Sequence, residues 1–124
     1  MFTDQAQLVL YVTDVKRAAD FWQSIGFEVL SIEEMDGSIV AEISPCSNSA
    51  LTFSLYDRQF VEEHAQQVNT NAPQIMFFAQ EIVQLYQKMQ EQQIEVGQLM
   101  QLEEDRFIFN FVDLEGNYFA VTGN

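Results

Sequence analysis

The 124-residue sequence has few of the residues that cross-link a chain, rigidify it or charge it positively. It contains one cysteine, Cys46, one histidine, His64, two prolines, and only 5 Lys and Arg against 19 Asp and Glu. A single cysteine excludes an internal disulfide and is typical of a reducing compartment. The formal net charge of −14 repels phosphate groups, so we expect neither nucleic acid nor a membrane as a partner.

Long apolar runs and a secretion signal are also missing. No apolar run reaches the length that spans a bilayer, and the N-terminal MFTDQAQ lacks the basic start and apolar run of a signal peptide. We therefore expect a cytoplasmic protein. Apolar residues make up 48% of the sequence, which is enough to build the core of one domain over residues 1–124. The acidic surplus fits two interpretations: it keeps the protein soluble, or it attracts a cationic ligand.

The two halves of the sequence share one plan. Residues 7–12 predict a strand, and a helix follows in 13-TDVKRAADFWQSIGF-27, which Thr13 or Asp14 caps and Gly26 ends. Residues 74–79 and the following segment repeat this pattern at an offset of 74 minus 7, or 67. The same offset pairs Trp22 with Met89, Asp14 with Glu81, and 51–53 with 118–120. An apolar pattern that repeats without gaps predicts a duplicated unit.

Each unit is predicted to run strand, helix and three strands, giving an α+β fold of two tandem βαβββ units. The first unit covers residues 1–56 and the second 74–124, with a polar connector over 57–73 that is compatible with a short helix. The last three strands of the two units are expected at 27–33, 37–44 and 50–56, and at 94–100, 105–112 and 117–122.

Two segments, 12-VTDVKRAADFWQSIGF-27 and 113-DLEGNYFAV-121, resemble the glyoxalase/bleomycin-resistance/dioxygenase family, also called the vicinal oxygen chelate superfamily. The sequence departs from that pattern at Trp22, where Tyr is usual, at Leu114 in place of Pro and at Glu115 in place of Asp. The resemblance implies that each unit curls into a half-barrel and that the concave faces enclose a pocket. It also implies a homodimer.

The resemblance places the four metal-ligand positions of the family at Gln7, Phe53, Gln74 and Ala120. Two neutral amides, a phenyl ring and a methyl group provide neither negative charge nor imidazole, which divalent cations require. The immediate neighbours of these positions add no carboxylate or histidine. We therefore predict no metal, no cofactor and no catalytic residues of the known family type.

Strand alternation predicts the lining of the implied pocket, because successive side chains point to opposite faces of a sheet. The residues expected to face it and bind a ligand are Gln7, Tyr11, Phe53, Gln74, Met76, Phe78, Tyr118 and Ala120. Such a mainly apolar, aromatic lining suits an organic molecule. The alternative is that these side chains fill the space and form an ordinary core.

Three further residues have open roles. His64, in the polar connector, is expected on a solvated helix surface. Cys46 lies in the turn 45-PCSNS-49 with no adjacent base to activate it. Glu42 lies within the apolar strand 39-IVAEI-43, either on its polar face or as an acid that faces a ligand.

Two classes of function remain from the sequence. The first is a small-molecule-binding protein that sequesters an aromatic or cationic antibiotic-like compound without catalysis, as the drug-binding members of the family do. The second is a divergent glyoxalase-like lyase or isomerase, or a dioxygenase-type enzyme. Metal content distinguishes them.

Overall fold

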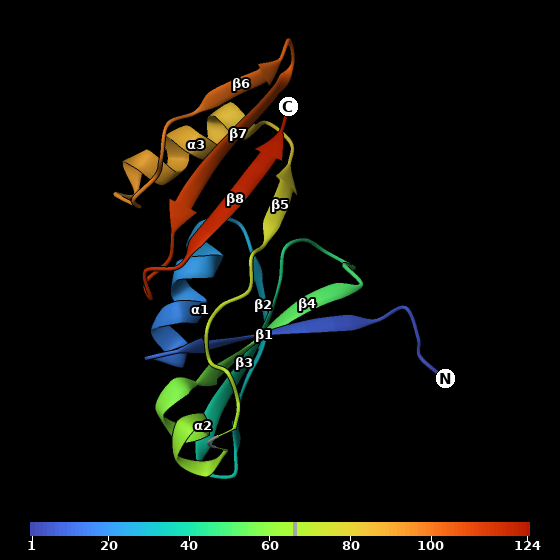
Figure 1. Cartoon of the computed structure of the whole chain (residues 1–124), viewed down its shortest axis with the longest axis vertical. Coiled ribbons are helices and arrows are strands. Elements are labelled where there is room, and N and C mark those ends of the chain that lie inside the picture. The colour runs from blue at the N-terminus through green and yellow to red at the C-terminus, as the bar shows by residue number, and fades with distance from the viewer. Residues whose placement is uncertain (66) are drawn as a thin grey trace. The chain divides into compact units, whose positions relative to one another are not determined.

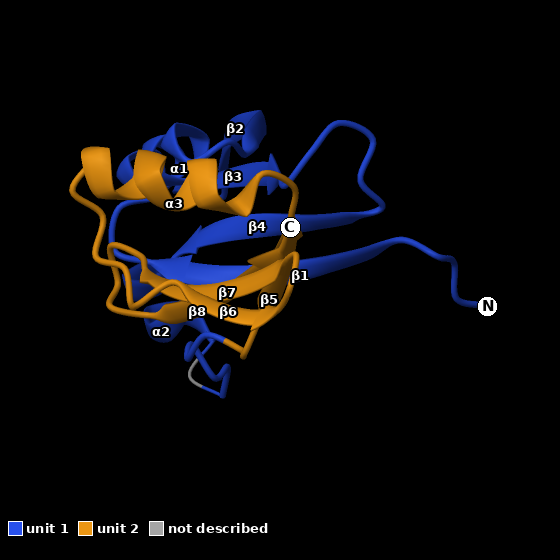
Figure 2. Ribbon diagram, turned by 90° about the horizontal axis from the view of Figure 1, so that it is seen from above, with its two compact units in different colours: residues 1–72 blue, residues 73–124 orange. Residues whose placement is uncertain are grey.

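The computed structural model describes residues 1–65 and 67–124, which form two compact units, 1–72 and 73–124 (Figures 1 and 2). Each unit contains a four-stranded sheet in which the first strand runs parallel to the last. The predicted α+β fold of two βαβββ units is confirmed. Most of the predicted connector 57–73 falls within the first compact unit, and Gln66 within it lies outside the described residues.

The first unit consists of β1 (Ala6–Val12), α1 (Val15–Ser24), β2 (Glu28–Met35), β3 (Ser38–Ser44), β4 (Leu51–Asp57) and α2 (Arg58–His64). Its sheet has the order β1-β4-β3-β2. The Asp14 side chain caps α1 by accepting a hydrogen bond from the Arg17 amide at 3.1 Å. Gly26 follows the helix with a φ of 111°, which permits the predicted left-handed turn.

The core of the first unit lies between α1 and one face of its sheet. Trp22 is 2% exposed and packs on Phe27, with ring centroids 4.9 Å apart. Phe27 in turn packs on Phe53 at 5.9 Å. Burying each such side chain stabilises the fold by about 1.5–3 kcal/mol. The buried sheet residues on this side are Leu10, Val12, Ala41, Ile43, Phe53 and Leu55.

The second unit consists of β5 (Met76–Ala79), α3 (Ile82–Glu91), β6 (Met100–Glu103), β7 (Arg106–Val112) and β8 (Tyr118–Gly123), in the sheet order β5-β8-β7-β6. The α3 helix lies 67 residues after α1, as the repeat predicts. The core of the second unit is built from Ile82, Met89, Phe109, Phe111, Phe119 and Val121. In the described part of the chain no helix is long and apolar enough to cross a membrane.

One strand of the second unit is displaced from its prediction. Residues 94–100 form only an isolated bridge, between Val96 and Phe111, and β6 begins at Met100. Gly97 lies in the middle of the predicted strand and has no side chain to pack, which weakens strand formation. Its amide bonds the Asn110 carbonyl at 2.8 Å, so this segment makes single contacts with β7 instead of a continuous ladder.

The turn between β7 and β8 is held by Asp113. Its carboxylate accepts hydrogen bonds from the amides of Glu115 at 2.9 Å and Asn117 at 2.8 Å, and from Asn117 Nδ2 at 3.3 Å. Gly116 has a φ of 82°, which favours glycine. Burial raises the pKa of Asp113 above its usual value of 3.8, although these hydrogen bonds oppose the shift.

Candidate functional site

The helices α1 and α3 each cover one face of their own sheet, and the strand registers decide which side chains occupy the other, open face. In the first unit β1 pairs Gln7 with Thr52, Leu8 with Phe53 and Tyr11 with Tyr56. Paired residues project to the same side of a sheet. Gln7 and Tyr11 therefore lie on the open face, as predicted, together with Thr52 and Tyr56.

The predicted orientation of Phe53 is wrong. Its side chain is 1% exposed and packs against Phe27 on the α1 side of the sheet. The error arises because the repeat is not free of gaps. Met76 pairs with Ala120, whereas Val9, its counterpart at an offset of 67, pairs with Ser54. The last strands of the two units are therefore related by an offset of 120 minus 54, or 66, which is one residue less than the offset of the first strands. A shift of one residue turns every side chain of a strand to the opposite face of the sheet.

A cluster of three polar side chains occupies one end of the open face of the first sheet. Gln7 Nε2 donates to Glu42 Oε2 at 3.0 Å and to Thr52 Oγ1 at 3.2 Å. Thr52 Oγ1 also donates to Glu42 Oε2 at 3.0 Å. Glu42 is therefore on the open face, where its carboxylate can pair with a cationic group. The sequence singled out Gln7 and Glu42, whereas Thr52 was missed because the register of β4 was assigned one residue off.

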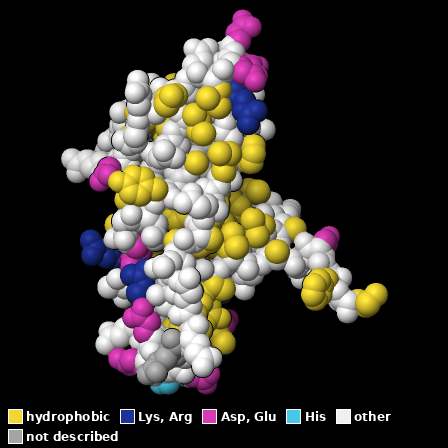
Figure 3. All heavy atoms as spheres, viewed as in Figure 1, with side chains coloured by type: hydrophobic (Ala, Val, Ile, Leu, Met, Phe, Trp, Pro, Cys, Tyr) yellow, Lys and Arg dark blue, Asp and Glu magenta, His cyan; other side chains and the backbone are white. Residues whose placement is uncertain are grey.

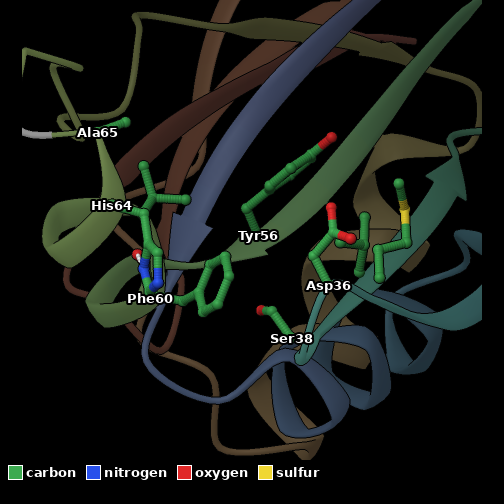
Figure 4. Close-up of a pocket in the computed structure, with 9 residues that line it drawn as sticks. Asp36, Ser38, Tyr56, Phe60, His64 and Ala65 are labelled. Atoms are coloured by element: carbon green, nitrogen blue, oxygen red, sulfur yellow. Dashed lines mark hydrogen bonds between the residues drawn. The ribbon is translucent and has the colours of Figure 1, made fainter.

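The opposite end of this face is aromatic and is covered by α2. The rings of Tyr11 and Tyr56 lie 6.4 Å apart. Arg58, in the first turn of α2, donates from a guanidinium nitrogen to the Tyr11 carbonyl at 2.8 Å. His64 is exposed, as predicted, and stacks on Phe60 with centroids 4.2 Å apart (Figure 4). Its Nδ1 lies 2.8 Å from the Phe60 carbonyl.

The open face of the second sheet carries large apolar side chains. Phe78 is 77% exposed, Tyr118 67% and Met76 50%. Ala120 pairs with Met76 on one side and with Asn110 on the other, so it lies on the same face. Figure 3 shows hydrophobic side chains gathered over this sheet. These orientations follow the predicted alternation, and a ligand-binding role for the residues stays a prediction.

Gln74 precedes β5 and is exposed. Cys46 is exposed as well, in the turn between β3 and β4. Neither residue makes a side-chain contact on which a chemical role can be built.

The family's metal positions do not fit a divalent cation. Phe53 is in the core, and Thr52, its neighbour on the open face, offers a neutral hydroxyl. Gln7 uses its Nε2 to bind Glu42. Across residues 1–65 and 67–124 no group of three or more His, Cys, Asp or Glu side chains gathers that could hold a metal ion. One carboxylate with an amide and a hydroxyl is a weak donor set for such an ion.

Two βαβββ units, each with a helix on one sheet face and an open second face, define a glyoxalase-type fold. The sequence matches the profile of the Glyoxalase/Bleomycin resistance protein/Dioxygenase superfamily over residues 5–121. The protein belongs to this superfamily. No curated protein matches the sequence.

Solved structures of several functions share the fold. TnmS3, an antibiotic binding protein from Streptomyces sp. CB03234, is 16% identical with a TM-score of 0.78, and the match covers 98% of this chain and 96% of TnmS3. UcmS2 is 15% identical with a TM-score of 0.75 and 98% coverage of both chains. Lactoylglutathione lyase from Agrobacterium tumefaciens is 17% identical with a TM-score of 0.69, covering 95% of this chain and 91% of the lyase. At these identities the likeness shows the fold alone.

Proposed function

We propose that the protein binds a small organic molecule of aromatic or cationic character and sequesters it without catalysis. The observation that carries this proposal is the apolar open face of the second sheet. Phe78, Tyr118 and Met76 are each at least half exposed there, although large apolar side chains are ordinarily buried. A contiguous exposed apolar surface marks a binding site for a ligand or a partner. Aromatic rings at such a site suit a planar guest.

The charge of the protein favours a cationic guest. The net charge of −14 raises the local concentration of cations around the surface. On the open face of the first sheet the Glu42 carboxylate is held by Gln7 and Thr52, so it is already positioned for a positive group. The remaining oxygen of Gln7 can accept a hydrogen bond from a cationic group that binds at Glu42. TnmS3, which has the same fold, is an antibiotic binding protein, which supports a small organic ligand.

The proposal includes a homodimer and excludes a metal. The homodimer is what membership of the superfamily implies, and twofold dimers are the commonest oligomers of soluble proteins. The donor set at the family's metal positions is too poor in charge for a bound ion to polarise a substrate.

A thermal-shift screen of aromatic cationic antibiotics against EDTA-treated protein tests the function. Binding to the native state raises the melting temperature, and we expect a saturable rise that added Zn²⁺, Ni²⁺ or Mn²⁺ leaves unchanged. Phe78→Ala should weaken the binding of a compound found in this screen by about 1–3 kcal/mol. Val83→Ala is the matched control, because Val83 is an exposed apolar residue on α3, away from the open face. Close to one tightly held metal ion per chain, lost in Gln7→Ala, would favour a lyase or dioxygenase instead.

A further inference from the structure

The first unit contains a cavity of about 180 Å³ where α2 closes over the end of the β2–β3 hairpin (Figure 4). Its walls are apolar and come from Met35, Val40, the ring of Tyr56, Phe60 and Val61. All of these residues belong to the compact unit 1–72. The cavity therefore needs no other part of the protein to form it.

The size of the cavity limits what it can hold. An apolar cavity of about 150 Å³ is large enough to bind benzene. The cavity in this protein is partly open to solvent, and its volume of about 180 Å³ accommodates one aromatic ring with a short side chain. Tyr56 and Phe60 supply ring faces against which such a guest can pack.

Two polar groups define the chemistry at one side of the cavity. Ser38 is only 9% exposed and lines the cavity. Figure 4 shows the Ser38 side chain directed into the cavity, and the Asp36 carboxylate reaching from the hairpin turn toward Tyr56. The Ser38 hydroxyl can accept a hydrogen bond from a ligand in the cavity. Among the described residues, the lining of the cavity contains no Lys or Arg.

We propose that this cavity is a second binding site, which takes the ring of a small arylalkylammonium compound. The ring lies between Tyr56, Phe60 and Val61, and the ammonium group donates hydrogen bonds to Asp36 and Ser38. The negative field of the protein favours this charge over an anionic one. The lining of this site shares no residue with the open face of the second sheet, where Phe78 and Tyr118 lie.

Titration of the whole protein with phenethylammonium tests the site, with 3-phenylpropionate as an anionic probe of similar size. We expect saturable binding of the cation, at least about tenfold tighter than that of the anion, and NMR shift changes at Val40 and Val61. Asp36→Asn should lower the affinity for the cation about tenfold at low ionic strength and leave the affinity for a neutral analogue, 3-phenylpropanol, unchanged. Asp36 has a φ of 53°, a left-handed conformation that Asn also tolerates, so this variant keeps the turn.

Val40→Phe should abolish binding of both the cation and the neutral analogue by filling the cavity. Because that change can also unfold the unit, Ser38→Ala provides a second variant, expected to weaken the cation several-fold with the fold intact. Phe78→Ala should leave the affinity unchanged, which separates this site from the proposed open-face site. Absence of saturable binding, an Asp36→Asn affinity equal to that of the wild type, or shift changes at Phe78 and Tyr118 instead of Val40 and Val61 would each overturn the proposal.

Discussion

Gln7 and Glu42 are joined across an intervening strand, with Gln7 Nε2 donating to Glu42 Oε2 at 3.0 Å although β1 and β3 are not neighbours in the sheet. Thr52 on β4, between them, donates to the same carboxylate oxygen. The carboxylate is thus fixed by two side chains from two strands. A charged group held in this way loses little conformational freedom when it meets a cation.

Replacing Glu42 by Gln tests this preorganised charge. The variant keeps a side chain of the same length but removes the charge, so affinity for a cationic ligand should fall about tenfold or more at low salt. The free energy of unfolding should change by less than about 1.5 kcal/mol, because the Gln side-chain oxygen can still accept the hydrogen bonds from Gln7 and Thr52. Isothermal titration calorimetry and urea denaturation measure the two effects. Glu28→Gln is the control, since Glu28 is an exposed carboxylate that also accepts one side-chain hydrogen bond, from Ser47. Equal losses of affinity in both variants would contradict a specific role for Glu42.

Two phenylalanines on opposite sides of their sheets should respond differently to removal of the ring. Phe53 is 1% exposed and Phe78 is 77% exposed. Phe53→Ala should therefore lower the free energy of unfolding by about 3–5 kcal/mol, and Phe78→Ala by less than about 1 kcal/mol. Urea unfolding followed by Trp22 fluorescence measures the Phe53 variant directly, because Trp22 lies in the same core, and circular dichroism measures both variants. A large loss of stability in Phe78→Ala would mean that its ring is packed, so that the open face is not a free binding surface.

Gly123 is required by the close approach of β8 to β5. A Cβ at this position would lie 1.8 Å from the Ala79 carbonyl oxygen and 2.9 Å from the carbonyl carbon, both backbone atoms that cannot rotate away. Gly123→Ala should lower the free energy of unfolding by about 1–3 kcal/mol or more, because β5 and β8 must separate to accommodate the added Cβ. Gly37→Ala is the matched control, because Gly37 has a φ of 85° but no atom within 4 Å of its added Cβ. Gly37→Ala should lower the free energy of unfolding by only about 1–2 kcal/mol, which is the penalty of a left-handed conformation for a residue with a Cβ. Hydrogen exchange should distinguish them further: faster exchange along β5 is expected in the Gly123 variant alone.

The half-buried carboxyl of Asp113 should make the free energy of unfolding depend on pH. Its pKa is raised in the folded state, mainly by desolvation, so the folded protein holds this proton more tightly than the unfolded chain does. The associated stabilisation is fully present below the usual value of 3.8 and is lost as pH rises through the folded-state pKa. Asp113→Asn does not titrate, so the stability of the wild type relative to this variant should fall as pH rises through that window. Urea unfolding of both proteins across a pH series measures the difference. A relative stability that increases with pH would mean that the hydrogen bonds from Glu115 and Asn117 outweigh desolvation.

The sequence predicts those parts of the fold that local chemistry determines. The Asp14 cap, the Gly26 turn and the apolar stripes of α1 and α3 depend on residues within a few positions of one another. Phe53 was misplaced because its face depends on a strand register between β1 and β4, which no local pattern specifies. Residues 94–100 were misplaced because Gly97 interrupts a pattern in which apolar residues recur between polar ones.

The candidate site also contains some residues that a local pattern places and others that depend on distant contacts. Alternation placed six residues on the open faces once the family resemblance had assigned Gln7, Gln74 and Ala120 to the concave side. These residues are Gln7, Tyr11, Met76, Phe78, Tyr118 and Ala120. The contacts of Thr52 and the cavity beside α2 could not be predicted in this way, because each depends on contacts between segments that are distant in the sequence. Thr52 meets Gln7 across 45 positions, and Phe60 lines a cavity with Met35.

The parallel pairing of the first strand with the last strand in each unit also bears on the order of folding. The β3–β4 and β7–β8 pairs are antiparallel hairpins that close over short connections, whereas β1 must wait for a partner 45 positions away. Closing the longer loop costs more entropy and slows the step. We therefore expect the hairpins to form early and β1 and β5 to join their sheets late. Since each unit has its own late strand, a ribosome-bound chain can complete the first sheet before the second has been synthesised.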